Sequence, residues 1–322
     1  MLFLILVVLL LMVFWVYNSP FPISMIVRMM FKKGVTVIPE NYNEILKQVA
    51  IERNISYQSK YKKGYFDLIY PKNQKSSLPI IIWVHGGGFV GGDKSDVEEY
   101  AVQIASNGYI IANINYALSP EVKYPTQIHQ LAEVFQFLTM NADEYNLDMS
   151  RVFFAGDSAG AHIVSQFALI QINKQYANML NIKKVMDFRN IRGMLLFCGL
   201  YDVKEFLNIS NNAFIKFVVR QIIWGYTGIR NLAGNGILQE LSVMDYVNKD
   251  FPATFITDGN KYTFTQQGIN FVDELEAIDI DVTSVFYDTQ EKIIHEYQFM
   301  MNNEYSYHTY QKVIQFLKNE SK

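Results

Sequence analysis

The sequence predicts one α/β domain built on a mostly parallel sheet, and three observations carry this prediction. From about residue 50 onward, short β-branched or aromatic runs alternate with longer amphipathic stretches, the pattern of strands joined by crossover helices. The chain has 322 residues, of which 50% are hydrophobic and 15% aromatic, enough to fill one large core. Only 18% of the residues are charged, which excludes disorder across the chain.

The predicted elements follow in order along this alternation. Extended residues at 55–58 and 65–70 flank Lys62-Lys63-Gly64, which indicates a hairpin and an antiparallel edge of the sheet. Residues 203–248 are longer than one crossover needs and contain an apolar helical stretch, so we expect a small lid insertion there. Helices are expected between strands at 65–70, 79–84, 109–116, 151–155, 191–198, 253–257 and 282–287.

Charge, cysteine and histidine content exclude several classes of protein. Lys plus Arg is 28 and Asp plus Glu is 31, a net charge of −3 that is too balanced for a nucleic-acid-binding surface. Cys198 is the one cysteine, so neither an intrachain disulfide nor a thiolate cluster can form. No HExxH or similarly close pair occurs among the histidines, so no metal site is expected. The histidines are His85, His129, His162, His295 and His308.

The N-terminal segment predicts a membrane anchor. Residues 1–17 carry no charged side chain, and a helix of this length reaches about 25 Å, close to the roughly 30 Å of a bilayer core. No signal-peptide cleavage pattern surrounds Asn18, so we expect an uncleaved transmembrane helix over residues 1–20. Arg28, Lys32 and Lys33 follow it, so the positive-inside rule places the main domain, residues 50–322, on the cytoplasmic side of the cell membrane. Residues 21–49 are expected to form a linker and cap-like segment.

Two glycine motifs carry candidate chemistry. Gly156-Asp157-Ser158-Ala159-Gly160 lies between a predicted strand and an apolar helical run, the context of a nucleophile elbow in which glycines allow close strand–helix approach and leave the serine hydroxyl exposed. Ser158 is therefore the candidate nucleophile.

The second motif, His85-Gly86-Gly87-Gly88-Phe89, follows the predicted strand at 79–84. Glycines here let backbone N–H groups turn toward the negative oxygen of a tetrahedral intermediate. A phosphate loop would require a following Lys-Ser/Thr or a GxGxxG pattern, and neither is present. The loop therefore predicts an oxyanion hole.

A serine nucleophile needs a general base and an acid that orients it, and chains with this elbow carry them in the order Ser, acid, His. His295 follows the last predicted strand and is the candidate base, with His308 at the start of the final helix as its rival. Asp258 ends the strand at 253–257, where its carboxylate would fix the histidine tautomer, and Asp202 is the alternative acid.

HGGGF and GDSAG, with Tyr116-Ala117-Leu118-Ser119-Pro120-Glu121 between them, resemble the hormone-sensitive-lipase-like branch of the α/β-hydrolases, which includes bacterial carboxylesterases. The similarity runs from about residue 79 to residue 295. It implies an α/β-hydrolase fold, with an eight-stranded sheet covered by helices on both faces. It also implies a serine hydrolase that cleaves carboxylic esters without a cofactor, with Ser158 as nucleophile and His295 as base. The implied oxyanion donors are the N–H groups of Gly86, Gly87 and Ala159.

The sequence departs from that family at two positions. Glu296 replaces the glycine of the family's His-Gly-Phe, and Lys261 stands where the acid usually does, which leaves Asp258 three residues earlier. The second departure supports an alternative, a catalytically weak or inactive protein that binds a small apolar ligand on a retained hydrolase fold. Amide or formamide hydrolysis is the near alternative to ester hydrolysis. Phe89 and the apolar stretch at 215–224 indicate an apolar acyl pocket.

Overall fold

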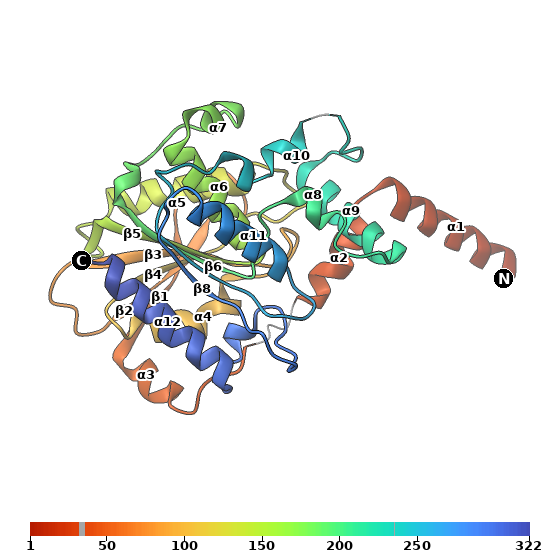
Figure 1. The fold of residues 1–322 in the computed structure, drawn as a ribbon. Coiled ribbons are helices and arrows are strands. Elements are labelled where there is room, and N and C mark those ends of the chain that lie inside the picture. The colour runs from red at the N-terminus through yellow and green to blue at the C-terminus, as the bar shows by residue number, and fades with distance from the viewer. Residues whose placement is uncertain (32–35, 235) are drawn as a thin grey trace.

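The computed structural model describes residues 1–31, 36–234 and 236–322, and its centre is one eight-stranded sheet (Figure 1). The strand order is β1-β2-β4-β3-β5-β6-β7-β8. Both pairs that involve β2 are antiparallel and all the others are parallel, so the predicted mostly parallel sheet with an antiparallel edge is confirmed. The strands are β1 (Val49–Ser56), β2 (Tyr65–Pro71), β3 (Leu78–Val84), β4 (Ile110–Ile114), β5 (Leu147–Asp157), β6 (Ile191–Phe197), β7 (Thr254–Thr257) and β8 (Val282–Val285).

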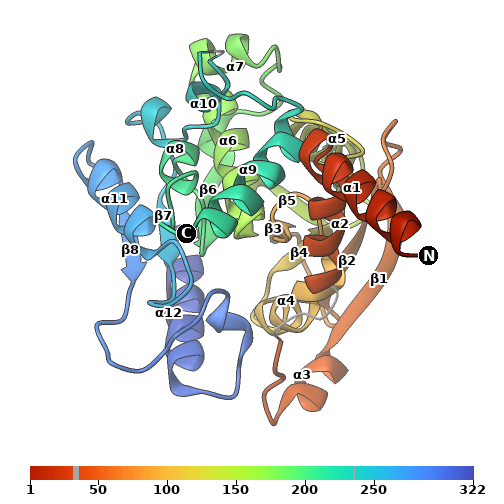
Figure 2. The ribbon, with the colours of Figure 1, turned by 90° about the vertical axis from the view of Figure 1, so that its right-hand side faces the viewer.

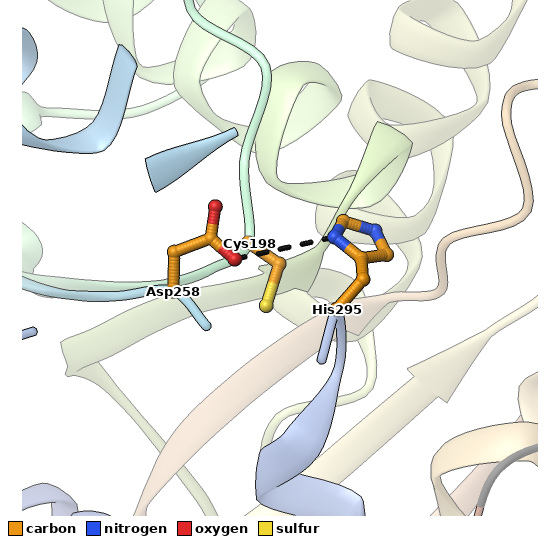
Figure 3. Close-up of side chains that lie close together, drawn as sticks. All are labelled: Cys198, Asp258 and His295. Carbon is orange, nitrogen blue, oxygen red and sulfur yellow. Dashed lines mark ion pairs between the residues drawn. The ribbon is translucent and has the colours of Figure 1, made fainter. Parts of the chain in front are cut away.

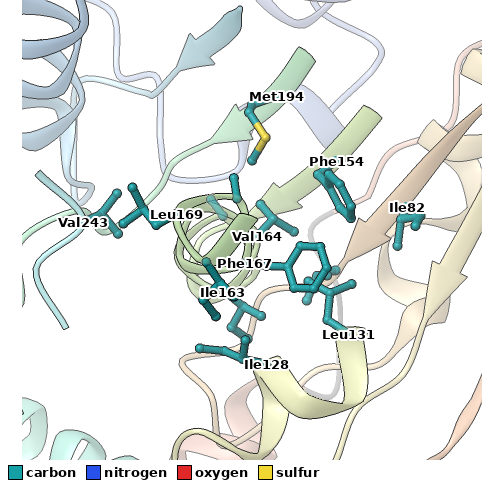
Figure 4. Packing of buried hydrophobic residues seen from close by; sticks show 14 of the residues in the cluster. Ile82, Ile128, Leu131, Phe154, Ile163, Val164, Phe167, Leu169, Met194 and Val243 are labelled. Atoms are coloured by element: carbon teal, nitrogen blue, oxygen red, sulfur yellow. The ribbon is translucent and has the colours of Figure 1, made fainter. Parts of the chain in front are cut away.

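Alternate side chains of the central strands enter two separate cores, because successive residues of a strand point to opposite faces of the sheet. On β3, Ile80 and Ile82 pack into the larger core, whereas Ile81 and Trp83 pack into the smaller one. Figure 4 shows part of the larger core, where Phe154 of the sheet meets Phe167 of a covering helix. The sheet is therefore the middle of three layers.

Helices cover both faces of this sheet. The larger core is closed by α5 (Thr126–Met140), α6 (Ala159–Ile172) and α11 (Thr265–Glu276). The smaller core is closed by α3 (Tyr42–Gln48), α4 (Glu98–Ala105) and α12 (Glu304–Glu320). A short helix, α7 (Lys174–Met179), follows α6.

The described residues of the insertion predicted at 203–248 form three α-helices, α8 (Val203–Phe206), α9 (Ala213–Thr227) and α10 (Ile237–Glu240), and a short 3-10 helix at Met244–Tyr246. The start of α9 is capped by the Asn212 side chain, which accepts hydrogen bonds from the N–H groups of Phe214 and Ile215. Gly228 ends the helix with a φ of 78°, a conformation that glycine adopts without steric cost. The apolar stretch of the insertion is thus one well-capped helix.

The N-terminal segment forms two helices, α1 (Leu2–Asn18) and α2 (Phe21–Met30). Figures 1 and 2 show α1 extending away from the body, while α2 lies beside α9. Among the residues that the model describes, no single helix has the length and apolar character to cross a bilayer; α1 and α2 pass that test only together, with a bend of 87° between them. The prediction of a single transmembrane helix over residues 1–20 is corrected, because α1 alone does not pass this test. Lys32 and Lys33, used to orient it, lie outside the described residues.

Candidate active site

Ser158 occupies a sharp turn between β5 and α6. Its φ of 51° is a conformation that a residue with a side chain rarely adopts, and its N–H donates to the Phe197 carbonyl at 2.8 Å. A Cβ on Gly160 would lie 1.9 Å from the Val84 carbonyl oxygen, and one on Gly156 would lie 2.4 Å from the carbonyl carbon of Gly160. The two glycines are therefore required for this turn, which is the geometry expected of a nucleophile elbow.

The predicted base lies beside the predicted nucleophile. The Nε2 atom of His295 is 3.0 Å from the Ser158 hydroxyl oxygen, although the two residues are 137 positions apart in the chain. The rival His308 is exposed on α12, where its Nδ1 meets the Tyr287 hydroxyl at 3.0 Å. His295 alone of the two can take a proton from Ser158.

The predicted acid reaches His295 through a third residue. Asp258 Oδ1 is 4.0 Å from His295 Nδ1, too far for a hydrogen bond. The Thr263 hydroxyl lies between them: it donates to Asp258 Oδ1, and its oxygen is 2.9 Å from His295 Nδ1. Asp258 is only 2% exposed and also accepts the N–H groups of Gly259 and Phe264. The arrangement is a chain of four side chains rather than a direct triad.

The other candidates for the acid position are elsewhere. Asp202 caps α8, with its carboxylate accepting the Lys204 N–H at 2.6 Å, so it is a turn residue. Lys261 pairs through its backbone with the loop that carries His295, and its side chain is exposed. Thr263, and not Lys261, contacts His295.

The predicted oxyanion donors are the N–H groups of Gly86, Gly87 and Ala159. The Gly86 N–H is already engaged, since it donates to Asp157 Oδ2 at 2.7 Å, and this corrects its predicted role as a donor to substrate. Within the described ranges, no protein acceptor takes the N–H groups of Gly87, Gly88 or Ala159. Gly87 has a φ of 102°, and a Cβ there would lie 2.3 Å from the Gly91 carbonyl oxygen. Free N–H groups therefore remain on Gly87, Gly88 and at the start of α6.

Two acidic side chains, Asp157 and Glu296, lie next to the oxyanion loop. Asp157 accepts hydrogen bonds from Trp83 Nε1 at 2.9 Å and from Gly86, and desolvation raises its pKa to about 6. Glu296, the residue that replaces the family's glycine, bonds to Asp157, and its pKa lies well above 4.5 because of desolvation and of the neighbouring Asp157 charge. These directions favour a neutral Glu296 that donates a hydrogen bond to the Asp157 carboxylate. Sequence reasoning missed this pair, although Asp157 lies within the elbow motif.

Cys198, Asp258 and His295 offer three metal-ligating atoms within 4.8 Å of one another (Figure 3). Desolvation raises the pKa of the Cys198 thiol well above 9, so it stays protonated, whereas a metal requires the thiolate. His295 Nδ1 and Asp258 Oδ1 are both already bonded to Thr263. The donor set therefore fits a histidine-orienting site better than a metal site.

A cavity of about 770 Å³ lies against His295 and the oxyanion loop. The walls come mainly from α2 and α9, with Ile23, Val27, Val218 and Ile222 among the lining residues, so the predicted apolar pocket is present. Phe89 does not line it; its ring stacks on Tyr226 at 3.8 Å and is buried. Residues 21–49 were predicted to form a linker and cap-like segment, and α2 of that segment lines the cavity.

Arg28 fixes α2 on this site. Its Nε donates to the Val90 carbonyl at 2.5 Å, its Nη2 donates to the Ser119 carbonyl at 2.8 Å, and both terminal nitrogens bond to the Glu121 carboxylate at 2.7 Å. These contacts attach α2 to the chain that follows the oxyanion loop, and a partly exposed bidentate ion pair between Arg28 and Glu121 contributes to holding this wall of the cavity in place.

Comparison with known proteins agrees with this fold. The model of the BD-FAE family matches residues 66–274, more than half of the chain, and the chain belongs to that family. A protein of Acanthamoeba polyphaga mimivirus that is named as an alpha/beta hydrolase is 32% identical over 108 residues, a match that covers 33% of this chain and only 31% of the viral protein. The resemblance to the α/β-hydrolases is thereby confirmed.

Solved structures extend the comparison to nearly the whole fold. Esterase B from Lactobacillus rhamnosis superposes with a TM-score of 0.75 at 20% identity, covering 96% of this chain and 95% of that one. The same enzyme inhibited by a tributyrin phosphonate gives 0.73 over 89% and 88% of the two chains, also at 20% identity. An esterase of Pyrobaculum calidifontis gives 0.67 at 15% identity over 92% of each chain. The chain therefore has the α/β-hydrolase fold, and these neighbours are esterases.

Proposed function

We propose that the protein is a serine hydrolase that cleaves carboxylic esters through an acyl-enzyme. The observation that carries this proposal is the 3.0 Å separation of Ser158 Oγ and His295 Nε2 at a strained elbow beside an apolar cavity. The family assignment and the esterase neighbours support the same reaction. Lys261, which favoured a non-catalytic binding protein, lies at the surface and no longer weighs against catalysis.

In the proposed mechanism, Ser158 Oγ attacks the ester carbonyl carbon while His295 Nε2 takes the hydroxyl proton. The negative oxygen is stabilised by the N–H groups of Gly87 and Ala159, with Gly88 as a third available donor. The protonated His295 then gives its proton to the leaving alcohol. In the second half of the reaction, His295 takes a proton from a water that attacks the acyl-enzyme, and it returns that proton to Ser158 as the acid product leaves. No cofactor takes part in these steps.

Thr263 and Asp258 orient the base in this mechanism. The Thr263 hydroxyl donates its one proton in the hydrogen bond to Asp258, so its oxygen can only accept a hydrogen bond from His295. This selects the His295 tautomer that carries a proton on Nδ1. The lone pair of Nε2 then faces Ser158, as general-base catalysis needs. Asp258 thus acts as the orienting acid through one intervening hydroxyl.

A fluorophosphonate tests the proposal directly, because it labels an activated serine whatever the natural substrate. The full-length protein should be labelled on Ser158, as peptide mass spectrometry would show, and His295→Ala should lose the label. Ser158→Ala should abolish ester hydrolysis with an unchanged circular dichroism spectrum. Absence of label on the folded protein would refute the proposal and favour a binding role. Matched ester and amide substrates would then decide the preferred leaving group.

We further propose that residues 1–17 attach the protein to a membrane, with the hydrolase domain on the cytoplasmic side of the cell membrane. Support comes from α1, which is uncharged and has no buried residue. Protease added to intact cells should leave the domain whole, and its digestion there would overturn the cytoplasmic orientation.

A further inference from the structure

The exposed apolar surface of α1 is unlike that of an ordinary surface helix. Phe3 is 80% exposed and Phe14 is 67% exposed, and no residue of the helix is buried. Apolar side chains occupy every face, since Leu2–Asn18 contains no charged residue. A second copy of the chain packed against α1 would cover one stripe and leave the others in water, whereas a bilayer surrounds all of them. The chemistry of this helix therefore favours lipid as its occupant.

The same surface continues onto the helices that wall the cavity. The end of α1 is held to α9, where the Tyr17 and Phe217 rings lie 5.6 Å apart and Gln221 Nε2 donates to the Val16 carbonyl at 3.3 Å. Figure 2 shows α1, α2 and α9 grouped on one side of the molecule. At that side Met30 of α2 is 73% exposed and Phe214 of α9 is 69% exposed, and both line the cavity.

The lining of the cavity combines apolar helices with a small set of polar side chains. The helices α2 and α9 contribute only apolar side chains to it, whereas the carboxyl and imidazole groups of the lining are those of Asp96, Asp157, His295 and Glu296. An acyl chain can thus lie between α2 and α9 while its ester reaches His295 and the Ser158 hydroxyl beside it. The volume of about 770 Å³ lies within the range of roughly 300 to 1,000 Å³ found for ligand pockets.

We propose that the cavity opens onto the bilayer in which α1 is embedded, and that its substrates are long-chain acyl esters taken from that bilayer between α2 and α9. This inference rests on the proposed ester hydrolysis and names its substrate class. The substrate is defined by its location in the bilayer and by the length of its acyl chain rather than by a particular head group, because α2 and α9 contribute only apolar side chains to the cavity.

The test compares two esters of the same alcohol for the full-length protein: a long-chain ester carried in phosphatidylcholine vesicles and a short-chain ester in solution. Leu6→Lys combined with Leu10→Lys places two charges in α1, away from the cavity. This variant should lose vesicle flotation and at least tenfold of its activity on the vesicle ester, with the soluble ester turned over within twofold of wild type. Unchanged activity on the soluble ester also shows that the variant folds. Met140→Lys, at an exposed apolar position on α5, is the matched control and should change neither activity.

A second variant tests the entrance itself. Phe214→Lys should keep vesicle flotation but reduce hydrolysis of the long-chain ester more than that of the short one. Equal losses on the two esters, or unchanged vesicle activity in the α1 variant, would overturn the inference. A dimer whose formation depends on α1, with no vesicle flotation, would assign the helix to a second copy and overturn it as well. Wild-type protein that floats with vesicles but hydrolyses neither ester would instead refute the proposed function.

Discussion

Replacing Thr263 by valine removes the hydroxyl that joins His295 to Asp258 and keeps the shape of the side chain. The Nδ1–H of His295 then faces a methyl group, because Asp258 Oδ1 remains 4.0 Å away. Leaving a buried donor unsatisfied costs about 1 to 3 kcal/mol. We therefore expect kcat/KM on a soluble ester to fall roughly 5- to 150-fold, with the loss mainly in kcat, since the hydroxyl does not touch the substrate.

Asp258→Asn should be more damaging, because an amide can donate to Thr263 and reverse the chain of hydrogen bonds; a wrong histidine tautomer in a comparable triad costs about 10⁴ in kcat. The two residues act in series, so Thr263→Val combined with Asp258→Asn should be scarcely worse than Asp258→Asn alone. Thr263→Ser keeps the hydroxyl and should stay within about threefold of wild type by the same reasoning.

The assay is the pH profile of kcat/KM together with the rate of fluorophosphonate labelling. Loss of the Nδ1 acceptor removes a bond that stabilises protonated His295, so the acid limb of Thr263→Val should move to lower pH. Thr265→Val is the matched control, since the Thr265 hydroxyl bonds to the Gly259 carbonyl in the same loop and does not reach His295. A Thr263→Val variant within twofold of wild type, or one whose loss adds fully to that of Asp258→Asn, would refute the relay.

The remaining predictions concern the base, the acidic pair and the elbow. Burial raises the pKa of Asp258 to about 6 and lowers the pKa of His295 to about 4, so kcat/KM should begin to fall as Asp258 is protonated near pH 6 and fall further as His295 is protonated near pH 4; a profile that stays flat down to pH 4 would contradict the role of Asp258. The folded-state pKa of Glu296 is raised, so its contribution to stability is complete below its unfolded pKa and is lost as the pH rises through the folded one. Glu296→Gln cannot ionise, so its Tm should fall less than that of wild type between pH 5 and 9. An equal decline in the two proteins would count against a neutral Glu296 in the folded state. Gly160→Ala should yield little folded protein on expression, because its Cβ would lie 1.9 Å from the Val84 carbonyl oxygen, whereas Gly234→Ala, where a Cβ meets no atom within 4 Å, should express far better despite its positive φ.

The parts of the site that could be predicted from the sequence are those in which local geometry imposes residue identity. The elbow needs Gly156 and Gly160 because strand and helix backbones meet there, so the motif itself marks Ser158. The parallel strands likewise follow from short, continuously apolar runs, because helices bury both faces of these strands, as in β3. Boundaries were less accurate: β5 begins at Leu147 rather than 151, since Leu147 pairs with Leu78 across the sheet. That pairing depends on a partner strand and has no local signal.

Thr263 could not be predicted because its role depends on how two loops meet, one after β7 and one after β8. A backbone bridge between Lys261 and Ile294 aligns the loops, and this register brings Thr263 rather than Lys261 beside His295. Counting residues from the strand at 253–257 placed Lys261 at the position of the family's acid, because sequence spacing carries no information on the path of the loop. The same limit explains α2: its apolar residues have no strand or motif beside them in sequence, and only the Arg28 contacts with Ser119 and Glu121 show that the helix belongs to the cavity. A site assembled from loop and helix contacts therefore has to be tested residue by residue, beginning with the hydroxyl on which the orientation of His295 depends.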